Sequence, residues 1–202
     1  MLRIVNFACG AQPAPGCINI DGSPTVLLAR LPLPCRAYGP RADFVRTIRA
    51  YRVEFGSAKR LSFPEQSLDA FYSCHTLEHL PRAECQDLLR RIRVWLKPAG
   101  VLRLVMPDLR RMAAAYVGGQ TNADRFVEET FLALDSRKWW QIFFGHAYHR
   151  WMYDALSLSE LLRTVGYQKV RECSFNESRL PELKALDIPA VAMQSFYIEG
   201  EK

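Results

Sequence analysis

Residues 68–108, LDAFYSCHTLEHLPRAECQDLLRRIRVWLKPAGVLRLVMPD, decide the fold class of this chain. Apolar runs at 68–73 and 101–106 predict two strands. Between them, Pro81 and Arg82 open a predicted helix over 83–96. Lys97-Pro98-Ala99-Gly100 ends that helix, because a cation in the last turn followed by Pro and Gly is a typical stop. Strand, helix and strand in this order predict a parallel βαβ unit.

Shorter patterned segments extend this unit in both directions. Further strands are expected at 2–8, 17–21, 51–55, 167–175 and 191–198, and further helices at 43–52 and 157–166. The last of these helices has Ser157 as its expected N-cap and Glu160 three residues on, which is a capping box. Only a loop with Pro181 and Pro189 joins the last two strands, so we expect them to be antiparallel. The fold class is therefore α/β, a Rossmann-like and mostly parallel sheet with an antiparallel C-terminal strand at its edge.

Length and composition favour one globular domain over 1–202. The chain has 202 residues and a formal net charge of +6, which suits the usual domain size. No apolar run approaches the ~20 residues that span a bilayer, and residues 1–10 predict a strand and not a signal peptide. Six cysteines lie at irregular spacing without a CxxC pair, which indicates free thiols in a cytoplasmic setting.

The balance of charge is basic, with a sequence pI near 9.1. Six arginines fall within residues 30–52 against one acid, Asp43. Such a stretch fits a phosphorylated or nucleotide-linked substrate or a nucleic acid. A solvated helix face is the simpler explanation, so a nucleic acid is a less favoured partner.

Ligands of doubly wound sheets bind outside the carboxyl ends of the strands. The residues expected there are Ala8-Cys9-Gly10, Asp21, Gly56-Ser57-Ala58, Ser73-Cys74-His75 and Pro107-Asp108. Asp21 is placed to accept hydrogen bonds from two ribose hydroxyls, although a turn carboxylate that caps Gly22-Ser23 is the alternative. The chain has no GxGxxG motif, which disfavours dinucleotide binding.

Five motifs follow one another along nearly the whole chain. They are IVNFACG at 4–10 with PG at 15–16 and INID at 18–21, FGSAKRLSFP at 55–64, SLDAFYSCHTLEHL at 67–80, LKPAGVLRLVMPD at 96–108, and HRWMYDALSLSELLRTVGY at 149–167. In this order they resemble the class I S-adenosylmethionine (SAM) dependent methyltransferases. More narrowly, they resemble a small bacterial methyltransferase-type-11-like branch that is often associated with surface-polysaccharide gene clusters.

The resemblance implies a SAM site, with S-adenosylhomocysteine as product and no metal. Its cofactor-binding residues are expected to be Phe7, Ala8, Cys9, Gly10, Asp21, Gly22, Ser57, Ala58, Cys74 and His75. Ala8 to Gly10 pass under the methionine part, Asp21 holds the ribose, and Ser57 flanks the adenine. Three features depart from the family pattern: Ala8 replaces the usual Gly, Ser57 replaces the usual Asp, and the connection between Gly10 and Asp21 is too short for a helix.

His75-Thr76-Leu77-Glu78-His79 also spells HxxEH, the inverted zinc-protease motif. That motif needs both histidines on one face of a helix, and Pro81 leaves barely one turn, so a zinc hydrolase is a remote alternative. His79 is expected to be a structural histidine or a general base near the methyl acceptor, since a neutral imidazole suits that task near pH 7.

Aromatic residues are concentrated at 139–153, WWQIFFGHAYHRWMY, which holds seven of the 23 aromatics of the chain. This segment lies in a helical insertion expected at about 109–154, where the related enzymes build the acceptor pocket. The residues expected to contact the acceptor are Trp139, Trp140, His146, His149, Arg150, Tyr153 and Asp154. A hydrophobic cluster that packs the insertion against the sheet and a homodimer interface are the alternatives.

These observations predict a SAM-dependent methyltransferase that acts on a small-molecule or glycan-linked acceptor, with a hydroxyl as the expected target and His79 or His149 as the base. The hydroxyl rests on analogy within the family. A catalytically inactive methyltransferase-fold binding or scaffold protein is the alternative, which Ala8, Ser57 and the short first connection favour.

Overall fold

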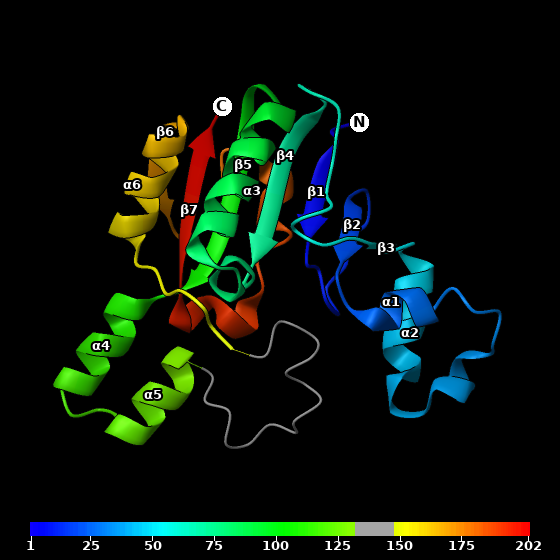
Figure 1. The fold of residues 1–202 in the computed structure, drawn as a ribbon, viewed down its shortest axis with the longest axis horizontal. Coiled ribbons are helices and arrows are strands. Elements are labelled where there is room, and N and C mark those ends of the chain that lie inside the picture. The colour runs from blue at the N-terminus through cyan, green and yellow to red at the C-terminus, as the bar shows by residue number, and fades with distance from the viewer. Residues whose placement is uncertain (132–147) are drawn as a thin grey trace.

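A single mixed sheet forms the centre of the molecule, and the computed structural model describes residues 1–131 and 148–202 (Figure 1). Its strand order is β3-β2-β1-β4-β5-β7-β6. The strands are β1 Ile4–Phe7, β2 Ile18–Asp21, β3 Glu54–Phe55, β4 Leu68–Cys74, β5 Leu96–Pro107, β6 Gln168–Cys173 and β7 Ser195–Glu201. The pairs from β3 to β5 are parallel, and β7 is antiparallel to both β5 and β6. The α/β class and the antiparallel C-terminal strand are confirmed.

Two features of the sheet differ from those predicted from the sequence. The C-terminal strand does not lie at the edge: β7 is inserted between β5 and β6, and all seven of its residues are buried. Strand β5 begins at Leu96 and not at Val101, because the chain leaves the preceding helix directly into pairing with Leu68. The segment expected to be a plain loop between the last two strands contains α7, Pro181–Lys184. The 3₁₀ helix η5, Pro189–Gln194, takes the place of the first residues of the strand expected at 191–198, which begins at Ser195.

Helices α3, Arg82–Trp95, and α6, Ala155–Val165, cover one face of the sheet. Their apolar positions recur at helical spacing, and α3 buries Leu88, Leu89 and Ile92 in the core of that face. Helix α6 begins at N-cap Asp154 and not at Ser157, because the Asp154 carboxylate accepts from the Ser157 backbone in the capping box. It ends, as expected, at Gly166 in the left-handed conformation.

Arg103 anchors the other face of the sheet. Its side chain, on β5, is fully buried, and its guanidinium donates to both carboxylate oxygens of Asp187 at 3.0 and 2.6 Å and to Glu199 at 3.0 Å. Glu199 lies directly opposite Arg103 on β7. The network therefore fixes β7 and the segment around α7 against the centre of the sheet.

Two helical groups extend beyond the carboxyl ends of the parallel strands, one on each side (Figure 1). The first contains α1, Pro24–Leu28, the 3₁₀ helix η1, Cys35–Arg41, and α2, Ala42–Ala50. Within it, Arg49 donates to the carbonyls of Ala29 and Leu31, so this arginine of the basic stretch holds the group together.

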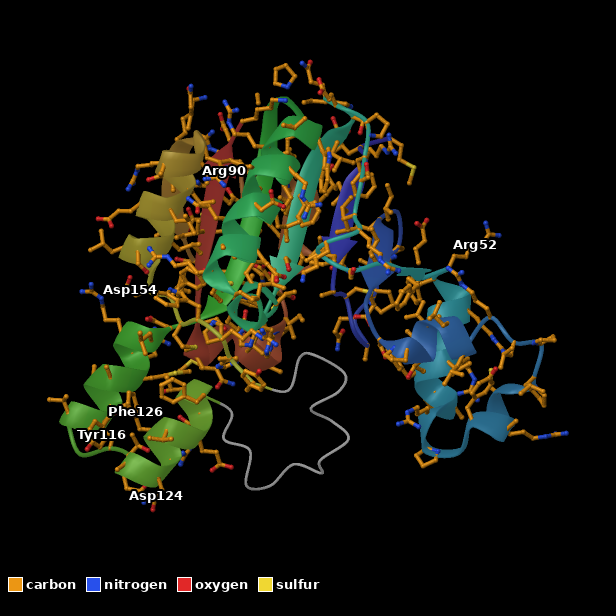
Figure 2. The ribbon with its side chains drawn as sticks, in the orientation of Figure 1. Arg52, Arg90, Tyr116, Asp124, Phe126 and Asp154 are labelled. Carbon is orange, nitrogen blue, oxygen red and sulfur yellow. The ribbon has the colours of Figure 1, made fainter. Side chains whose placement is uncertain are left out.

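The second group contains α4, Leu109–Val117, and α5, Ala123–Phe131. These helices are joined by stacking of Tyr116 on Phe126, with ring centroids 5.0 Å apart (Figure 2). Both helices lie within the range of the helical insertion expected at about 109–154. In the described part of the chain, no helix has the length and apolar character needed to cross a membrane.

Replacing the buried arginine is expected to be costly. Arg103→Leu should lower the free energy of unfolding by about 3–5 kcal/mol, because it leaves Asp187 buried without its cation and leaves Glu199 paired with Arg171 alone. Denaturant unfolding measures the change. Arg90→Leu, on the exposed face of α3, is the matched control and should change stability by no more than about 0.5 kcal/mol. Equal losses in the two variants would contradict the assigned role.

Candidate functional site

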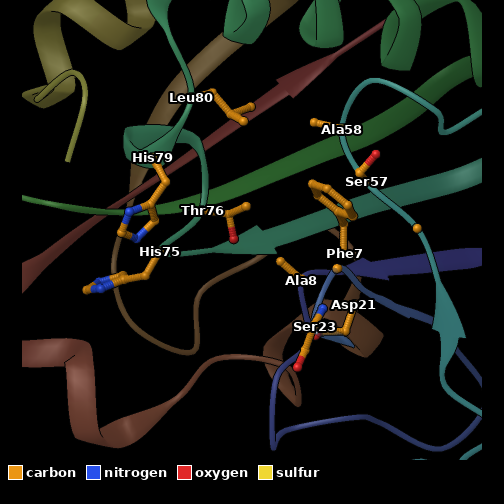
Figure 3. A pocket seen from close by; sticks show the side chains of 12 residues that line it. Phe7, Ala8, Asp21, Ser23, Ser57, Ala58, His75, Thr76, His79 and Leu80 are labelled. Carbon is orange, nitrogen blue, oxygen red and sulfur yellow. Dashed lines mark hydrogen bonds between the residues drawn. The ribbon is translucent and has the colours of Figure 1, made fainter. Parts of the chain in front are cut away.

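A cavity of about 250 Å³ opens at the carboxyl ends of β1, β2 and β4 (Figure 3). Its lining comes from loops that are distant in sequence and that the parallel strands bring together. The lining residues are Phe7, Ala8, Asp21, Gly22, Ser23, Gly56, Ser57, Ala58, His75, Thr76, His79 and Leu80. Figure 3 shows His75 and His79 at one end of this cavity and Asp21 and Ser57 toward the other.

Two backbone amides hold the carboxylate of Asp21 in place. Gly10 donates its N–H to Oδ2 at 2.9 Å, and Ser23 donates its N–H to Oδ1 at 2.8 Å. Asp21 is only 8% exposed and lines the cavity. Each carboxylate oxygen can accept more than one hydrogen bond, so the group is held in one orientation and retains acceptor capacity toward the cavity.

The turn after β1 is left-handed. Ala8 has φ +55° and Gly10 has φ +51°, and a residue other than Gly in this region is strained by about 1–2 kcal/mol. Ala8 also presents its methyl group to the cavity. The departure from Gly that the sequence shows at this position therefore affects both the backbone and the space for a ligand.

A pair of buried asparagines stabilises the short connection between β1 and β2. Asn6 donates its Nδ2 to the Asn19 Oδ1 at 3.1 Å. Asn19 in turn bonds the backbone of Ala14 twice, as acceptor from its N–H and as donor to its carbonyl, each at 2.8 Å. These bonds replace the packing that a crossover helix would supply.

His75 is a neutral side chain at the cavity wall. Its Nε2 lies 2.7 Å from the Ser195 Oγ, and that hydroxyl donates to the Val191 carbonyl at 2.7 Å. Ser195 has one proton to donate, so His75 carries its proton on Nε2. Burial, with repulsion from His149, lowers the pKa of His75 to about 4. Burial also raises the pKa of the neighbouring Cys74 thiol to about 12, so Cys74 is no nucleophile at neutral pH.

Glu78, His79 and His149 form a compact cluster at this end of the cavity. Glu78 and His79 belong to the 3₁₀ turn η2, Leu77–His79, and His149 lies on the segment that leads into α6. The two imidazole rings have centroids 5.0 Å apart. The Glu78 carbonyl accepts from the Arg150 N–H at 2.7 Å and the Trp151 N–H at 3.1 Å, which ties the two segments together. Burial raises the pKa of the Glu78 carboxyl to about 8.

The cavity unites most of the residues that the sequence assigned to the cofactor. Seven of them line it, whereas Cys9, Gly10 and Cys74 do not, although Gly10 orients Asp21. The sequence analysis placed Gly56 at a strand end and Ser23 in the turn after Asp21 but assigned neither to the cofactor, and it gave no binding role to Thr76 or Leu80, which also line the cavity. The close packing at Gly56 explains why this position is a glycine. A Cβ there would lie 2.7 Å from the Ile20 Cγ2, so a larger residue would displace the Ile20 side chain.

The residues expected at the acceptor pocket lie in different surroundings. Tyr153 is buried in the core under α3 and α6, and Asp154 caps α6 and pairs with Arg110 at 3.2 Å. Arg150 lies over the Tyr148 ring at 5.3 Å. Trp139, Trp140 and His146 lie outside the described residues.

A family model described as a methyltransferase domain matches residues 16–104. A SAM-dependent methyltransferase from Mesorhizobium loti is 21% identical over 100% of this chain and 91% of its own, with a TM-score of 0.56. Another from Thermotoga maritima is 15% identical over 99% and 82%, with a TM-score of 0.57. One from Archaeoglobus fulgidus is 14% identical over 100% and 86%, with a TM-score of 0.55. A search of curated proteins gives no significant match.

The donor set of the cavity fits SAM. A carboxylate with spare acceptor capacity suits a ribose diol, and Asp21 offers one inside the cavity. Phe7, Ala58 and Leu80 supply apolar surface for a nucleobase. The neutral His75 at the other end adds no positive charge against a sulfonium.

Ala8→Gly is expected to tighten the binding of S-adenosylhomocysteine a few-fold, because it removes a methyl group from the cavity. It should also raise the free energy of unfolding by up to about 1 kcal/mol, since relief of the left-handed strain outweighs the flexibility of glycine in the unfolded chain. Calorimetric titration and denaturant unfolding measure the two effects.

Ala99→Gly is the matched control, because Ala99 is also left-handed, with φ +59°, but lies away from the cavity. It should change stability alone. Unchanged or weaker ligand binding in Ala8→Gly would show that the Ala8 methyl does not limit the site.

Proposed function

We propose that this chain is a class I SAM-dependent methyltransferase and that it methylates a hydroxyl group of a small-molecule or glycan-linked acceptor; the matched methyltransferase domain and the fold support the first part. The observation that carries the proposal is the division of the cavity into two ends. Asp21 and Ser57 lie toward one end, and His79, beside His149 and Glu78, lies at the other.

Bound SAM supplies a methyl group that is already activated by its sulfonium. The task of the protein is therefore positioning, which brings donor and acceptor into line. Asp21 would orient the ribose, Phe7 and Leu80 would supply apolar surface to the nucleobase, and Ser57 would flank it. This arrangement directs the reactive end of the cofactor toward His75 and His79.

A hydroxyl acceptor must lose its proton as the new bond forms. Imidazole is the side chain best matched to that proton near neutral pH, and His79 brings one to the cavity wall with His149 behind it. We therefore assign the activation of the acceptor to these two histidines, together with Glu78.

The surface beside this end favours a glycan-linked acceptor. Trp151 is 42% exposed, and the Arg82 guanidinium lies 4.8 Å from its ring centroid. An exposed indole offers a face on which a sugar ring stacks, and the nearby cations Arg82 and Arg150 suit an anionic linkage such as a phosphate. The six unpaired cysteines favour a reducing compartment, and we place the enzyme in the cytoplasm as a single domain over 1–202.

A non-catalytic module with the same fold is the second candidate, which the Ala8 methyl in the cavity favours. Such a protein would bind S-adenosylhomocysteine weakly or not at all and would transfer no methyl group. The two experiments below separate it from the enzyme.

Asp21→Ala is expected to weaken the binding of S-adenosylhomocysteine roughly 100-fold. Two hydrogen bonds to a carboxylate contribute about 3 kcal/mol or more, and tenfold in affinity corresponds to about 1.4 kcal/mol. Isothermal titration calorimetry measures it, with Asp124→Ala on the surface of α5 as the control that keeps wild-type affinity. Wild-type affinity in Asp21→Ala would place the cofactor elsewhere.

The double variant His79→Ala/His149→Ala is expected to lose methyl transfer to a panel of hydroxylated and glycoside acceptors by at least 100-fold. Transfer of radiolabelled methyl from SAM measures it. Binding of S-adenosylhomocysteine should stay within a few-fold, because Asp21 and the apolar walls remain. Full activity in the double variant would exclude these histidines from catalysis.

A further inference from the structure

The cluster of Glu78, His79 and His149 has the composition and spacing of a metal site. Each residue offers one donor atom, and these atoms all lie within 4.8 Å of one another. Ligand bonds of about 2.0–2.2 Å for zinc and similar ions require donors roughly 3–4 Å apart. Modest side-chain rotation therefore brings the three donors around one ion.

Glu78 is the unusual member. The residue is 1% exposed, and neither of its carboxylate oxygens has a hydrogen-bond partner within the described ranges. A buried carboxyl group whose oxygens make no hydrogen bond is costly in either protonation state. The other acids at comparable depth are satisfied: Asp21 by two amides, and Asp187 and Glu199 by Arg103. A bound cation would supply what Glu78 lacks.

Both histidines are oriented as metal ligands are. The Nδ1–H of His79 donates to the Tyr148 carbonyl at 3.1 Å, and the Nδ1–H of His149 donates to the Thr130 carbonyl at 2.7 Å. A carbonyl only accepts, so these contacts fix the proton on Nδ1 and the lone pair on Nε2 in the neutral rings. Metal-binding histidines characteristically donate their other ring N–H to a carbonyl or carboxylate in this way.

We propose that Glu78, His79 and His149 bind one divalent transition-metal ion at the acceptor end of the cavity. Two imidazoles and one carboxylate favour zinc and its first-row neighbours over Mg²⁺ or Ca²⁺, which prefer oxygen ligands. Three protein ligands leave a coordination position open. His79 lines the cavity, so that position is reachable from the acceptor side.

The ion deepens the proposed function, on which its catalytic role rests. An acceptor hydroxyl that occupies the open position becomes more acidic, and water carries its proton away. The acceptor oxygen then forms a bond to the methyl carbon of SAM while the carbon–sulfur bond breaks and its electron pair remains on sulfur. The two histidines would then contribute to catalysis by binding the ion that activates the acceptor hydroxyl.

This site differs from the one that HxxEH implies, which would use His75 and His79. The His75 Nε2–H is bound to the Ser195 hydroxyl, and His75 is not a member of the three-residue cluster. His75 is therefore an internal control: it lies on the same cavity wall but should not contribute to the metal.

The test is calorimetric titration of chelator-treated protein with ZnCl₂, without SAM or acceptor. One Zn²⁺ per chain is expected to bind, and Glu78→Gln and His149→Gln should each weaken binding at least 100-fold. His75→Gln should stay within about threefold of wild type. MgCl₂ should show no saturable binding at the same protein concentration. Retained binding of S-adenosylhomocysteine shows that the Glu78 and His149 variants are folded.

A measurement on the wild-type protein tests the metal site even if one of the variants does not fold. In a ¹H–¹⁵N spectrum of the imidazoles, Zn²⁺ should shift the signals of His79 and His149 and leave those of His75 in place. Absence of stoichiometric binding, unchanged affinity in both variants, or equal loss in His75→Gln would overturn the site. Zinc binding in a protein that methylates no hydroxyl would overturn the proposed function and leave the site standing.

Discussion

The parallel pairing of β1 with both β2 and β4 is the constraint on which the site depends. Phe7, the last residue of β1, pairs with Ile20 on one side and Ser73 on the other. Parallel strands place their carboxyl ends at the same edge, so this register brings together the three loops that follow. Ala8 and His75 lie in these loops, Asp21 is the last residue of β2, and the cavity forms where they meet.

The buried acidic residues differ in the partners of their carboxyl groups, and this difference separates structural from functional acids. Arg103 neutralises Asp187 and Glu199 on one face of the sheet, and this network has no opening to the cavity. The Asp21 carboxylate is held by amides and still faces the cavity. Glu78 alone among these acids has neither arrangement in the described structure. A carboxylate kept at such a cost, beside two oriented imidazoles, is best explained by a ligand.

The sequence predicted what depends on local pattern and on strand ends. Asp21 and Ser57 could be placed because each lies at the carboxyl end of an expected strand, and parallel pairing brings these ends to one edge of the sheet. The contact of His79 with His149 was not predicted, because it depends on the path of the chain over 70 residues. The same holds for β7, whose place between β5 and β6 depends on Arg103 and Glu199 meeting across the strands. Sequence patterning identifies strands but not their neighbours.

A crystal structure of the protein with S-adenosylhomocysteine tests the central claim, that the edge formed by β1, β2 and β4 holds the cofactor, most directly. We predict that the ribose hydroxyls lie within hydrogen-bond distance of the Asp21 carboxylate. The sulfur is expected to face the end of the cavity formed by His75 and His79. A ligand bound outside this cavity, or one whose ribose lies away from Asp21, would contradict it.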